Sequence, residues 1–343
     1  VRKALIESAR DESHGLHRYM PNAGLADVRA VIAESLSPEC KVELSANDVV
    51  MVCGAAGGLN ITLKTLLDPG DEVIIFAPYF VEYLFYADNH GGKAVAVPPL
   101  DDFRLNFDAL QNALNEKTKA VIINSPNNPT GVLYSRQELQ ELARVLKAHS
   151  DKLGKAVYLI SDDPYKKITF DGVEAPNIME FYQDSIYITS HSKDIALPGE
   201  RIGFLAVHPQ CESAGLLMAG LIFCNRVLGF VNAPALIQRV VKQVQGVTVD
   251  VEQYRRKRDY LYNELTRIGY QVVKPQGAFY FFPKSPLEDE VEFVKKLADK
   301  KVLVVPGRGV GLPGYFRISY CLPDSVIEGS IAGFEKAYHE CQA

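Results

Sequence analysis

The segment SIYITSHSKDIALPGER, residues 185–201, places Lys193 in a turn between two predicted strands. Residues 185–189 form the first strand and residues 201–207 the second, because both runs are apolar and rich in β-branched and aromatic side chains. Neighbouring cations lower the pKa of an amine in such a turn, and a partly neutral lysine can form a covalent bond with a carbonyl compound. A solvated lysine in a polar surface turn is the alternative, since short strings of Ser and Lys are common.

The same turn carries groups that suit a bound anion. Ser190 and Ser192 flank Lys193 with two hydroxyl groups, and Arg201 adds a guanidinium eight residues after the lysine. Hydroxyl donors together with one fixed cation are typical of a phosphate site.

A second candidate anion site follows the predicted strand at residues 49–52. Small residues at 54–58 separate this strand from an apolar helix that we expect over residues 59–67. Backbone N–H groups at a helix N-terminus bind phosphate, and we expect those of Ala55 and Ala56 to do so. A closely packed turn without a ligand is the alternative.

Two further polar loops follow predicted strands. Asn124-Ser125-Pro126-Asn127-Asn128-Pro129-Thr130-Gly131 comes after the apolar run 120–123, and Ser161-Asp162-Asp163-Pro164-Tyr165 comes after the run 158–160. Each loop alone is ordinary turn chemistry. In an open α/β sheet, however, ligands bind outside the carboxyl ends of the strands, so these loops can converge with Lys193 on one molecule.

The order of the predicted elements indicates two units. Strands and helices alternate from residue 49 to residue 207, which favours a mostly parallel sheet flanked by helices. From about residue 249 the pattern changes to a long helix and then short elements, which predicts a smaller α+β unit. We expect these short elements at residues 277–282, 291–300, 302–305 and 317–320.

Composition agrees with a protein of about two domains. The chain has 343 residues, a formal net charge of -5 and 47% hydrophobic residues, so it can bury a sizeable core and lacks the basic excess of a nucleic-acid-binding surface. The one basic cluster, residues 254–258, is expected to form a solvated helix face. The six cysteines show neither a CxxC pair nor metal-ligand spacing, and no apolar run reaches the roughly 20 residues of a membrane span. We therefore expect free thiols, no metal, no membrane contact and a cytoplasmic location.

The chain resembles the class I (fold type I) aminotransferases of the aspartate aminotransferase superfamily, which use pyridoxal 5'-phosphate. The resemblance runs over the whole chain and rests on four motifs in the family's order: Asn128-Pro129-Thr130-Gly131, Asp162-x-x-Tyr165, Ser190-x-Ser192-Lys193 with Arg201, and Phe316-Arg317-Ile318-Ser319. It implies an α/β fold with a large domain at 24–248. It also implies a discontinuous small domain made of residues 1–23 and 249–343.

The resemblance implies roles for the residues around the cofactor ring. Lys193 would hold the cofactor covalently and then move a proton as the base, while Asp162 would pair with the ring nitrogen. Tyr165 and Asn128 match donors to the phenolic oxygen of the ring. Phe80 matches the aromatic residue that stacks on the ring, with core packing as the alternative.

The resemblance also implies how the phosphate and the substrate are bound. The phosphate would contact Ser190, Ser192, Arg201, Ala55 and Ala56. Tyr19 matches a tyrosine that reaches the phosphate of a neighbouring subunit, which implies a homodimer with shared sites; a packing residue that joins the domains is the alternative. Arg317 matches the arginine that binds the substrate α-carboxylate through two parallel hydrogen bonds.

The substrate side chain is less defined by these motifs. Some dicarboxylate-specific relatives carry a lysine at the position of Ala56, and Arg226 is the remaining candidate for a distal carboxylate, with an interface ion pair as the alternative. Aspartate, glutamate, alanine and aromatic amino acids remain possible donors, with 2-oxoglutarate as the usual acceptor. The sequence begins without Met, where the family has a further segment that covers the substrate.

We therefore predict a transaminase that moves an amino group from an L-amino acid to a 2-oxo acid by a ping-pong mechanism. A lyase or decarboxylase on the same fold is the first alternative, because these enzymes share the same cofactor-binding motifs. A non-catalytic sensor of the cofactor or of an amino acid is the second.

Overall fold

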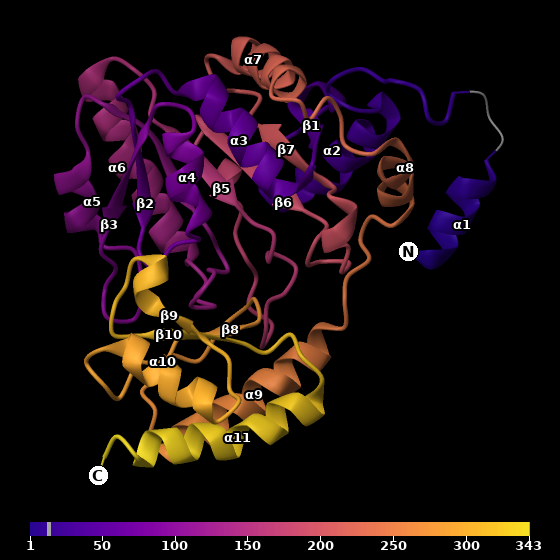
Figure 1. Cartoon of the computed structure of the whole chain (residues 1–343). Helices are drawn as coiled ribbons and strands as arrows, with labels where there is room; N and C mark the ends of the chain where they lie inside the picture. The colour runs from indigo at the N-terminus through magenta and orange to yellow at the C-terminus, as the bar shows by residue number, and fades with distance from the viewer. Residues whose placement is uncertain (12–14, 343) are drawn as a thin grey trace.

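The computed structural model describes residues 1–11 and 15–342. Figure 1 shows a larger unit built on a seven-stranded sheet and a smaller unit built on a three-stranded sheet. Helices cover both faces of the large sheet. The predicted α/β fold with a second, smaller unit is confirmed.

The large sheet is mostly parallel, as expected. Its order is β1-β7-β6-β5-β4-β2-β3, and only β7 runs antiparallel to its two neighbours, β1 and β6. The strands are β1 (Val49–Val52), β2 (Glu72–Phe76), β3 (Lys93–Val97), β4 (Thr118–Ile123), β5 (Tyr158–Asp162), β6 (Ser185–Ser190) and β7 (Gly203–Val207).

Two layers of helices bury the faces of this sheet. Successive strand residues point to opposite faces, so Val50 and Val52 of β1 pack in one core and Val49 and Met51 in another. The first face packs against α3 (Gly54–Leu66), α4 (Glu82–Asp88) and α7 (Ala214–Val227). The second packs against α2 (Ala26–Cys40), α5 (Phe107–Ala113), α6 (Arg136–Leu153) and α8 (Ala235–Gln243).

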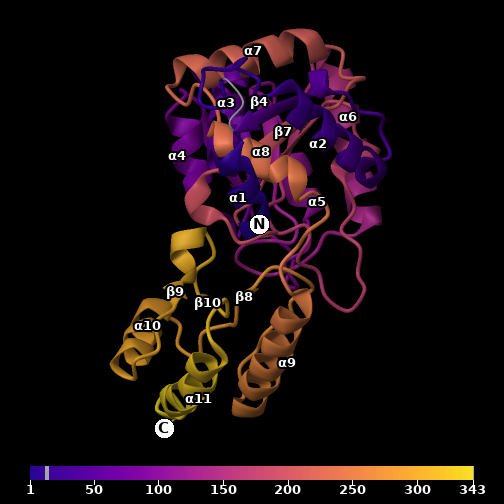
Figure 2. The same cartoon turned by 90° about the vertical axis from the view of Figure 1, so that its right-hand side faces the viewer.

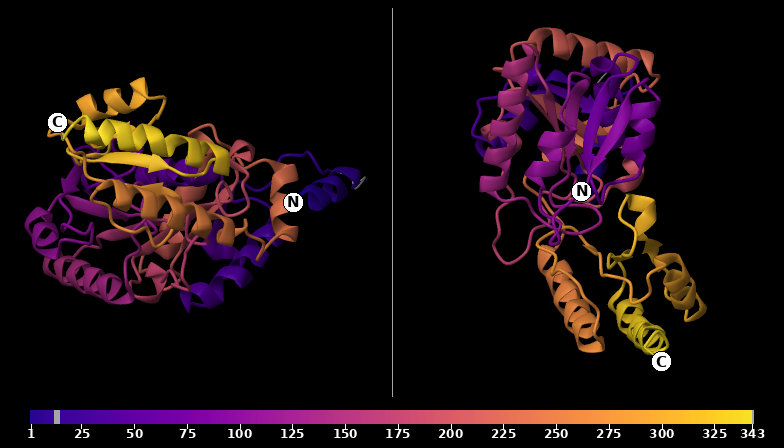
Figure 3. Two further views of the ribbon diagram at one scale, coloured as in Figure 1. Left: turned by 90° about the horizontal axis from the view of Figure 1, so that it is seen from below. Right: turned by 90° about the vertical axis from the view of Figure 1, so that its left-hand side faces the viewer.

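The small unit has its own core of aromatic and aliphatic side chains. Figure 3 shows its helices α9 and α11 side by side, and these two helices contact each other. The elements of this unit are α9 (Val251–Ile268), β8 (Tyr280–Phe281), α10 (Glu290–Asp299), β9 (Val305–Pro306), β10 (Phe316–Ser319) and α11 (Asp324–His339). Short 3-10 helices occur at Ala46–Asp48, Ile178–Glu180, Pro198–Glu200 and Gly307–Val310.

Local signals in the sequence explain where the long helices begin and end. The hydroxyl of Ser135 accepts a hydrogen bond from the N–H of Glu138, whose carboxylate accepts one in return from the N–H of Ser135, and α6 begins there. Helix α6 ends at Gly154, which has φ 67°. The side chain of Asp250 caps α9 in a similar way.

Two element boundaries differ from expectation. Helix α3 begins at Gly54 rather than at Leu59, because residues without large side chains let the first turns of the helix lie close to the sheet. A Cβ on Gly58 would lie 2.8 Å from the Cγ2 of Ile188. Arg201 lies outside β7, in a left-handed turn with φ 50°, rather than within the predicted strand.

The N-terminal helix α1 (Arg2–Arg10) packs against α8. Its Ala4 shares a small apolar cluster with Ile195, Val240 and Val244, and Figure 2 shows α1 beside α8 at the level of the large unit. We expected residues 1–23 to join the small unit. The described part of that segment differs, because the apolar side of α1 finds its partner on α8.

Within residues 1–11 and 15–342, no helix combines the length and the apolarity needed to cross a bilayer.

Arg258 ties α9 to the loops next to it. Its guanidinium is buried, donates hydrogen bonds of 2.7 and 2.9 Å to the carboxylate of Asp171 and one of 3.1 Å to the carbonyl of Pro275, and lies over the ring of Phe170. The basic cluster was expected to be a solvated face, and for Arg258 that expectation is wrong. A planar guanidinium that binds a carboxylate through two hydrogen bonds can be buried where a lysine would not be.

We expect Arg258→Ala to destabilise the protein. The side chain of Asp171 is 50% exposed and regains water, so the loss is about 2–4 kcal/mol of unfolding free energy rather than the about 3–5 kcal/mol of a fully buried pair. Urea denaturation, monitored by circular dichroism, measures this free energy of unfolding. Arg256→Ala, on the exposed side of the same helix, is the control and should change stability by less than about 0.5 kcal/mol. Equal stability of the two variants would contradict this account of Arg258.

Candidate active site

The carboxyl ends of β4, β5 and β6 lie at one edge of the large sheet, because these strands pair in parallel. Figure 1 shows the loops that follow them between the sheet and the small unit. Asn124, Asp162 and the turn with Lys193 therefore meet at this edge, as the sequence predicts.

Asp162, the last residue of β5, has a buried carboxylate with two different oxygen environments. Oδ2 accepts a hydrogen bond of 2.7 Å from the hydroxyl of Tyr83. Oδ1 is buried and has no hydrogen-bond partner among the described residues. Burial raises the pKa of Asp162 to about 7, although the bond from Tyr83 acts in the opposite direction. An unpaired buried acceptor of this kind fits a ligand that brings an N–H donor.

Asn124 fixes the backbone at this point. Its side-chain amide donates to the carbonyl of Asp162 at 2.5 Å, and its Oδ1 accepts from the N–H of Asn128 at 2.6 Å. The loop that carries Asn128 is thereby held against the end of β5.

Arg317, in β10 of the small unit, reaches across to this loop. Its Nη1 donates to Oδ1 of Asn128 at 3.0 Å, and its guanidinium lies over the ring of Tyr280 at 5.1 Å. The hydroxyls of Tyr280 and Tyr165 are 2.9 Å apart. The other nitrogen atoms of the Arg317 guanidinium, Nε and Nη2, donate no hydrogen bond to another described residue. They remain available as donors to a carboxylate ligand.

Lys193 is half-buried beside the same cluster. Its ammonium lies 5.5 Å from the centre of the Phe279 ring, and Phe279 in turn packs edge-on against Tyr165. Burial lowers the pKa of Lys193; Cys321 acts in the opposite direction, and the positive charge of Arg201 lowers the pKa further. A neutral fraction of this amine is what nucleophilic attack on a carbonyl carbon requires.

Arg201, one of the residues predicted to bind an anion, lies at the start of α3. Gly54, with φ +72°, is the first residue of α3, and a Cβ on it would lie 2.8 Å from Nη2 of Arg201. Arg201 therefore lies against the start of this helix, where the N–H groups of Ala55 and Ala56 are among those without a partner in the helix. Ser190, at the end of β6, and Ser192 are both buried nearby in the chain.

Three predicted residues lie at the edges of this arrangement. Phe80 is partly buried and packs edge-on against Tyr83, with ring centres 5.6 Å apart. Tyr19 is 89% exposed, and the guanidinium of Arg226 lies over its ring at 5.9 Å. Within this chain Tyr19 and Arg226 thus contact each other on the surface.

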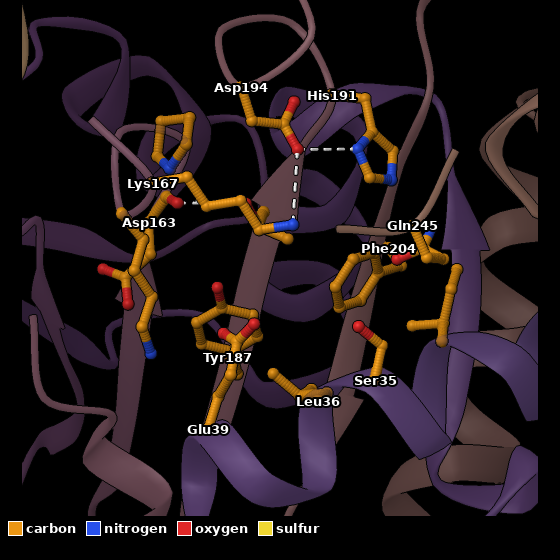
Figure 4. A pocket seen from close by; sticks show the side chains of 14 residues that line it. Ser35, Leu36, Glu39, Asp163, Lys167, Tyr187, His191, Asp194, Phe204 and Gln245 are labelled. Atoms are coloured by element: carbon orange, nitrogen blue, oxygen red, sulfur yellow. Dashed lines mark hydrogen bonds and ion pairs between the residues drawn. The ribbon is translucent and has the colours of Figure 1, made fainter. Parts of the chain in front are cut away.

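A polar pocket lies behind the turn that carries Lys193 (Figure 4). The carboxylate of Asp194 lies between the ring of His191, at 2.9 Å, and the ammonium of Lys167, at 4.0 Å. The cavity has a volume of about 30 Å³, enough for one or two water molecules. Asp163, His191 and Asp194 all line this pocket.

Sequence reasoning missed Tyr83, Tyr280 and the role of Asn124. Asn124 stands at the start of a loop that was recognised for Asn128, so its position was visible but its two hydrogen bonds were not. Tyr83 follows Phe80 by three residues, which places both on one side of a helical turn, and this spacing was the available signal.

Comparisons with known proteins agree with this geometry. The family model described as aminotransferase class I and II matches residues 1–332. An aminotransferase structure from Eubacterium rectale superimposes with a TM-score of 0.97 at 38% identity, covering 100% of this chain and 87% of that one. A probable aspartate aminotransferase of Methanocaldococcus jannaschii is 32% identical over 96% of this chain and 88% of its own length. The aromatic-amino-acid aminotransferase 2 of Thermococcus litoralis is 31% identical over 95% and 85%.

The match to the family model spans nearly the whole chain, and the relatives are similar along nearly their full lengths. The chain therefore belongs to the class I and II aminotransferases and is a transaminase that depends on pyridoxal 5'-phosphate.

Proposed function

We propose that Lys193, Asp162, Tyr165 and Arg317 carry the transamination in this chain. The observation that supports this most strongly is a set of contacts that runs from Lys193 through Phe279 to Tyr165, and on through Tyr280 to Arg317. Hydrogen bonds through Asn124 and Asn128 link Asp162 to the same arginine. Elements of both units contribute, so the site requires the large and the small unit together.

The cofactor, when bound, supplies an aldehyde that takes up amines covalently and a ring that accepts electrons from the substrate α-carbon. Lys193 would hold the cofactor through this group and, as a free amine, would move the proton at the substrate α-carbon. The lowered pKa of Lys193 favours both steps, because both use the neutral amine.

Asp162 fits the ring nitrogen of the cofactor. The unpaired Oδ1 is a buried acceptor, and an N–H brought to it would satisfy the oxygen and neutralise its charge. Asp162 would keep a proton on that nitrogen, which would strengthen the ring as an electron acceptor. Asn128 and Tyr165 complete the ring site as donors to the phenolic oxygen, since burial raises the pKa of Tyr165 and keeps its hydroxyl protonated.

The cofactor phosphate fits the opening of α3. Arg201 supplies a fixed cation, and the first N–H groups of the helix with Ser190 and Ser192 supply neutral donors. Phe80 completes the ring site as the stacking residue. We propose residues 24–248 as the cofactor-binding domain and residues 249–343 as the domain that brings Arg317.

The enzyme acts as a homodimer in this proposal. Helix α7 exposes Leu216, Phe223 and Val227 at 80%, 64% and 53%, next to a Tyr19 that is 89% exposed. Such an apolar surface on one helix favours burial against a second copy. Tyr19 and Arg226 would then serve the neighbouring site, Tyr19 at the phosphate and Arg226 at a distal carboxylate of the substrate.

Aspartate is the donor that we propose first, with 2-oxoglutarate as acceptor. Several similar proteins are named aspartate aminotransferase, and Arg226 offers a cation for the second carboxylate. Aromatic amino acids are the second candidate, because of the Thermococcus litoralis relative and the tyrosines around Arg317. Free cysteines throughout the chain support a cytoplasmic location.

We expect L-aspartate, added alone to the cofactor-loaded enzyme, to remove the visible absorption band of the cofactor and to release one equivalent of 2-oxo acid per site. 2-Oxoglutarate should then restore the band. Lys193→Ala should lack the covalent band from the start, whereas Lys147→Ala, on an exposed position of α6, should behave as wild type. Release of ammonia or carbon dioxide with the band unchanged would instead indicate a lyase or decarboxylase.

Arg317→Lys should reduce kcat/KM for every amino acid donor. A lysine cannot bind the α-carboxylate through two parallel hydrogen bonds, and the loss of a desolvated charge contact costs about 2–5 kcal/mol, or roughly 30- to 5,000-fold. Steady-state kinetics with each donor measures this. Amines without a carboxylate provide the control, because their slow turnover should be unchanged; an equal loss for these amines would contradict the proposed role.

Phe223→Asp should convert the dimer into monomers, because a carboxylate on the apolar face of α7 would be buried without a partner. Sedimentation velocity measures the mass. Leu303→Asp, at a position of the small unit that is 85% exposed, is the control and should leave the dimer intact. A Phe223→Asp variant that stays dimeric would place the interface elsewhere.

A further inference from the structure

We infer that Tyr83 is a positioning residue for Asp162: its hydroxyl holds one carboxylate oxygen so that the other remains available to the cofactor ring nitrogen. This inference rests on the role proposed above for Asp162 and adds a residue that none of the recognised motifs contains.

The geometry of the pair is specific. The Tyr83 hydroxyl donates to Oδ2 of Asp162 at 2.7 Å, and both side chains are buried, at 3% and 5% exposure. Within residues 1–11 and 15–342, no other side chain donates a hydrogen bond to this carboxylate, and Oδ1 is unpaired. The contact therefore distinguishes two oxygens that are chemically equivalent in solution.

Tyr83 is itself held in place from two sides. It lies near the start of α4, which packs against the same face of the sheet as α3. Its ring packs edge-on against Phe80 at 5.6 Å. A rigid buried donor of this kind restricts the rotation of the Asp162 carboxylate, whose backbone carbonyl Asn124 already fixes.

Tyr83 also favours the charged form of Asp162. Burial raises the pKa of Asp162, the hydrogen bond from Tyr83 lowers it, and the neighbouring charge of Asp163 raises it. The other titratable groups that sense this carboxylate are Tyr165 and Tyr86, both acting as neutral side chains at neutral pH because burial raises their pKa values. Removal of the Tyr83 hydroxyl would therefore raise the pKa of Asp162 further.

These pKa effects determine how the affinity for the cofactor depends on pH. Below its pKa, Asp162 carries a proton that must be lost when a protonated ring nitrogen binds beside it, so affinity for the cofactor falls as the pH falls. A higher pKa moves this loss of affinity to higher pH. If Tyr83 only filled space, removal of its hydroxyl would leave the pH at which cofactor affinity is lost unchanged.

The test is the affinity of the cofactor-free, full-length protein for pyridoxal 5'-phosphate. The affinity is measured by absorbance titration at pH values from about 5.5 to about 8.5, which bracket the Asp162 pKa of about 7. Tyr83→Phe should weaken binding at neutral pH by roughly 10- to 150-fold, the range for a hydrogen bond to a charged group, and should shift the acidic midpoint upward by about one unit.

Tyr182→Phe is the matched control. Tyr182 is also a buried tyrosine of the large unit at 3% exposure, and its hydroxyl donates to the carbonyl of Val157 at 2.8 Å. This variant loses that bond and the 3.3 Å contact of the hydroxyl with Oγ of Ser150, so it should lower stability at least as much as Tyr83→Phe and leave the pH midpoint of cofactor binding unchanged.

Asp162→Asn, alone and combined with Tyr83→Phe, separates the two claims. If Tyr83 acts through Asp162, Tyr83→Phe should have no further effect on affinity or midpoint in the Asn background. Asp162→Asn without any effect would overturn the proposed role of Asp162 itself. A normal midpoint in Tyr83→Phe, with Asp162→Asn impaired, would overturn only the inference about Tyr83.

Discussion

The burial of the Asp162 carboxylate at the end of β5 is the constraint around which the site is organised. A charged group in such a place requires partners. The residues that the structure describes supply one, the hydroxyl of Tyr83, and leave the second oxygen without a partner. The parallel pairing of β4, β5 and β6 brings the loops with Asn128 and Lys193 to the same edge. A cofactor with a ring N–H at one end and a phosphate at the other suits this edge, because Asp162 offers an acceptor and the start of α3 offers N–H donors.

The small unit contributes as much to the site as the sheet does. Arg317 comes from its strand β10 and binds the Asn128 loop, while Phe279 lies next to Lys193. The backbone N–H of Tyr79, beside the stacking candidate Phe80, donates to the carbonyl of Val310 at 2.9 Å. These cross-contacts couple the distance between the two units to the geometry around the substrate carboxylate.

The mostly parallel sheet and the site residues in the loops after β4, β5 and β6 could be predicted from the sequence. Their signals are local, because each apolar strand run is followed directly by a polar loop. Tyr83 and Tyr280 were missed, because a tyrosine in an apolar stretch looks like core until the acceptor of its hydroxyl is known. Arg258 was misjudged for the same reason, since its partner Asp171 lies far away in the chain. The packing of α1 on α8 depends on tertiary contacts that no local pattern specifies.

The most direct test of the account is the protonation state of the cofactor ring nitrogen. Nitrogen-15 NMR of the full-length protein, loaded with pyridoxal 5'-phosphate labelled at that nitrogen, measures it at neutral pH. The account predicts a protonated nitrogen in the wild type and an unprotonated one in Asp162→Asn, because only an ionised carboxylate stabilises the positive ring. An unprotonated nitrogen in the wild type, or the same signal in both proteins, would contradict it.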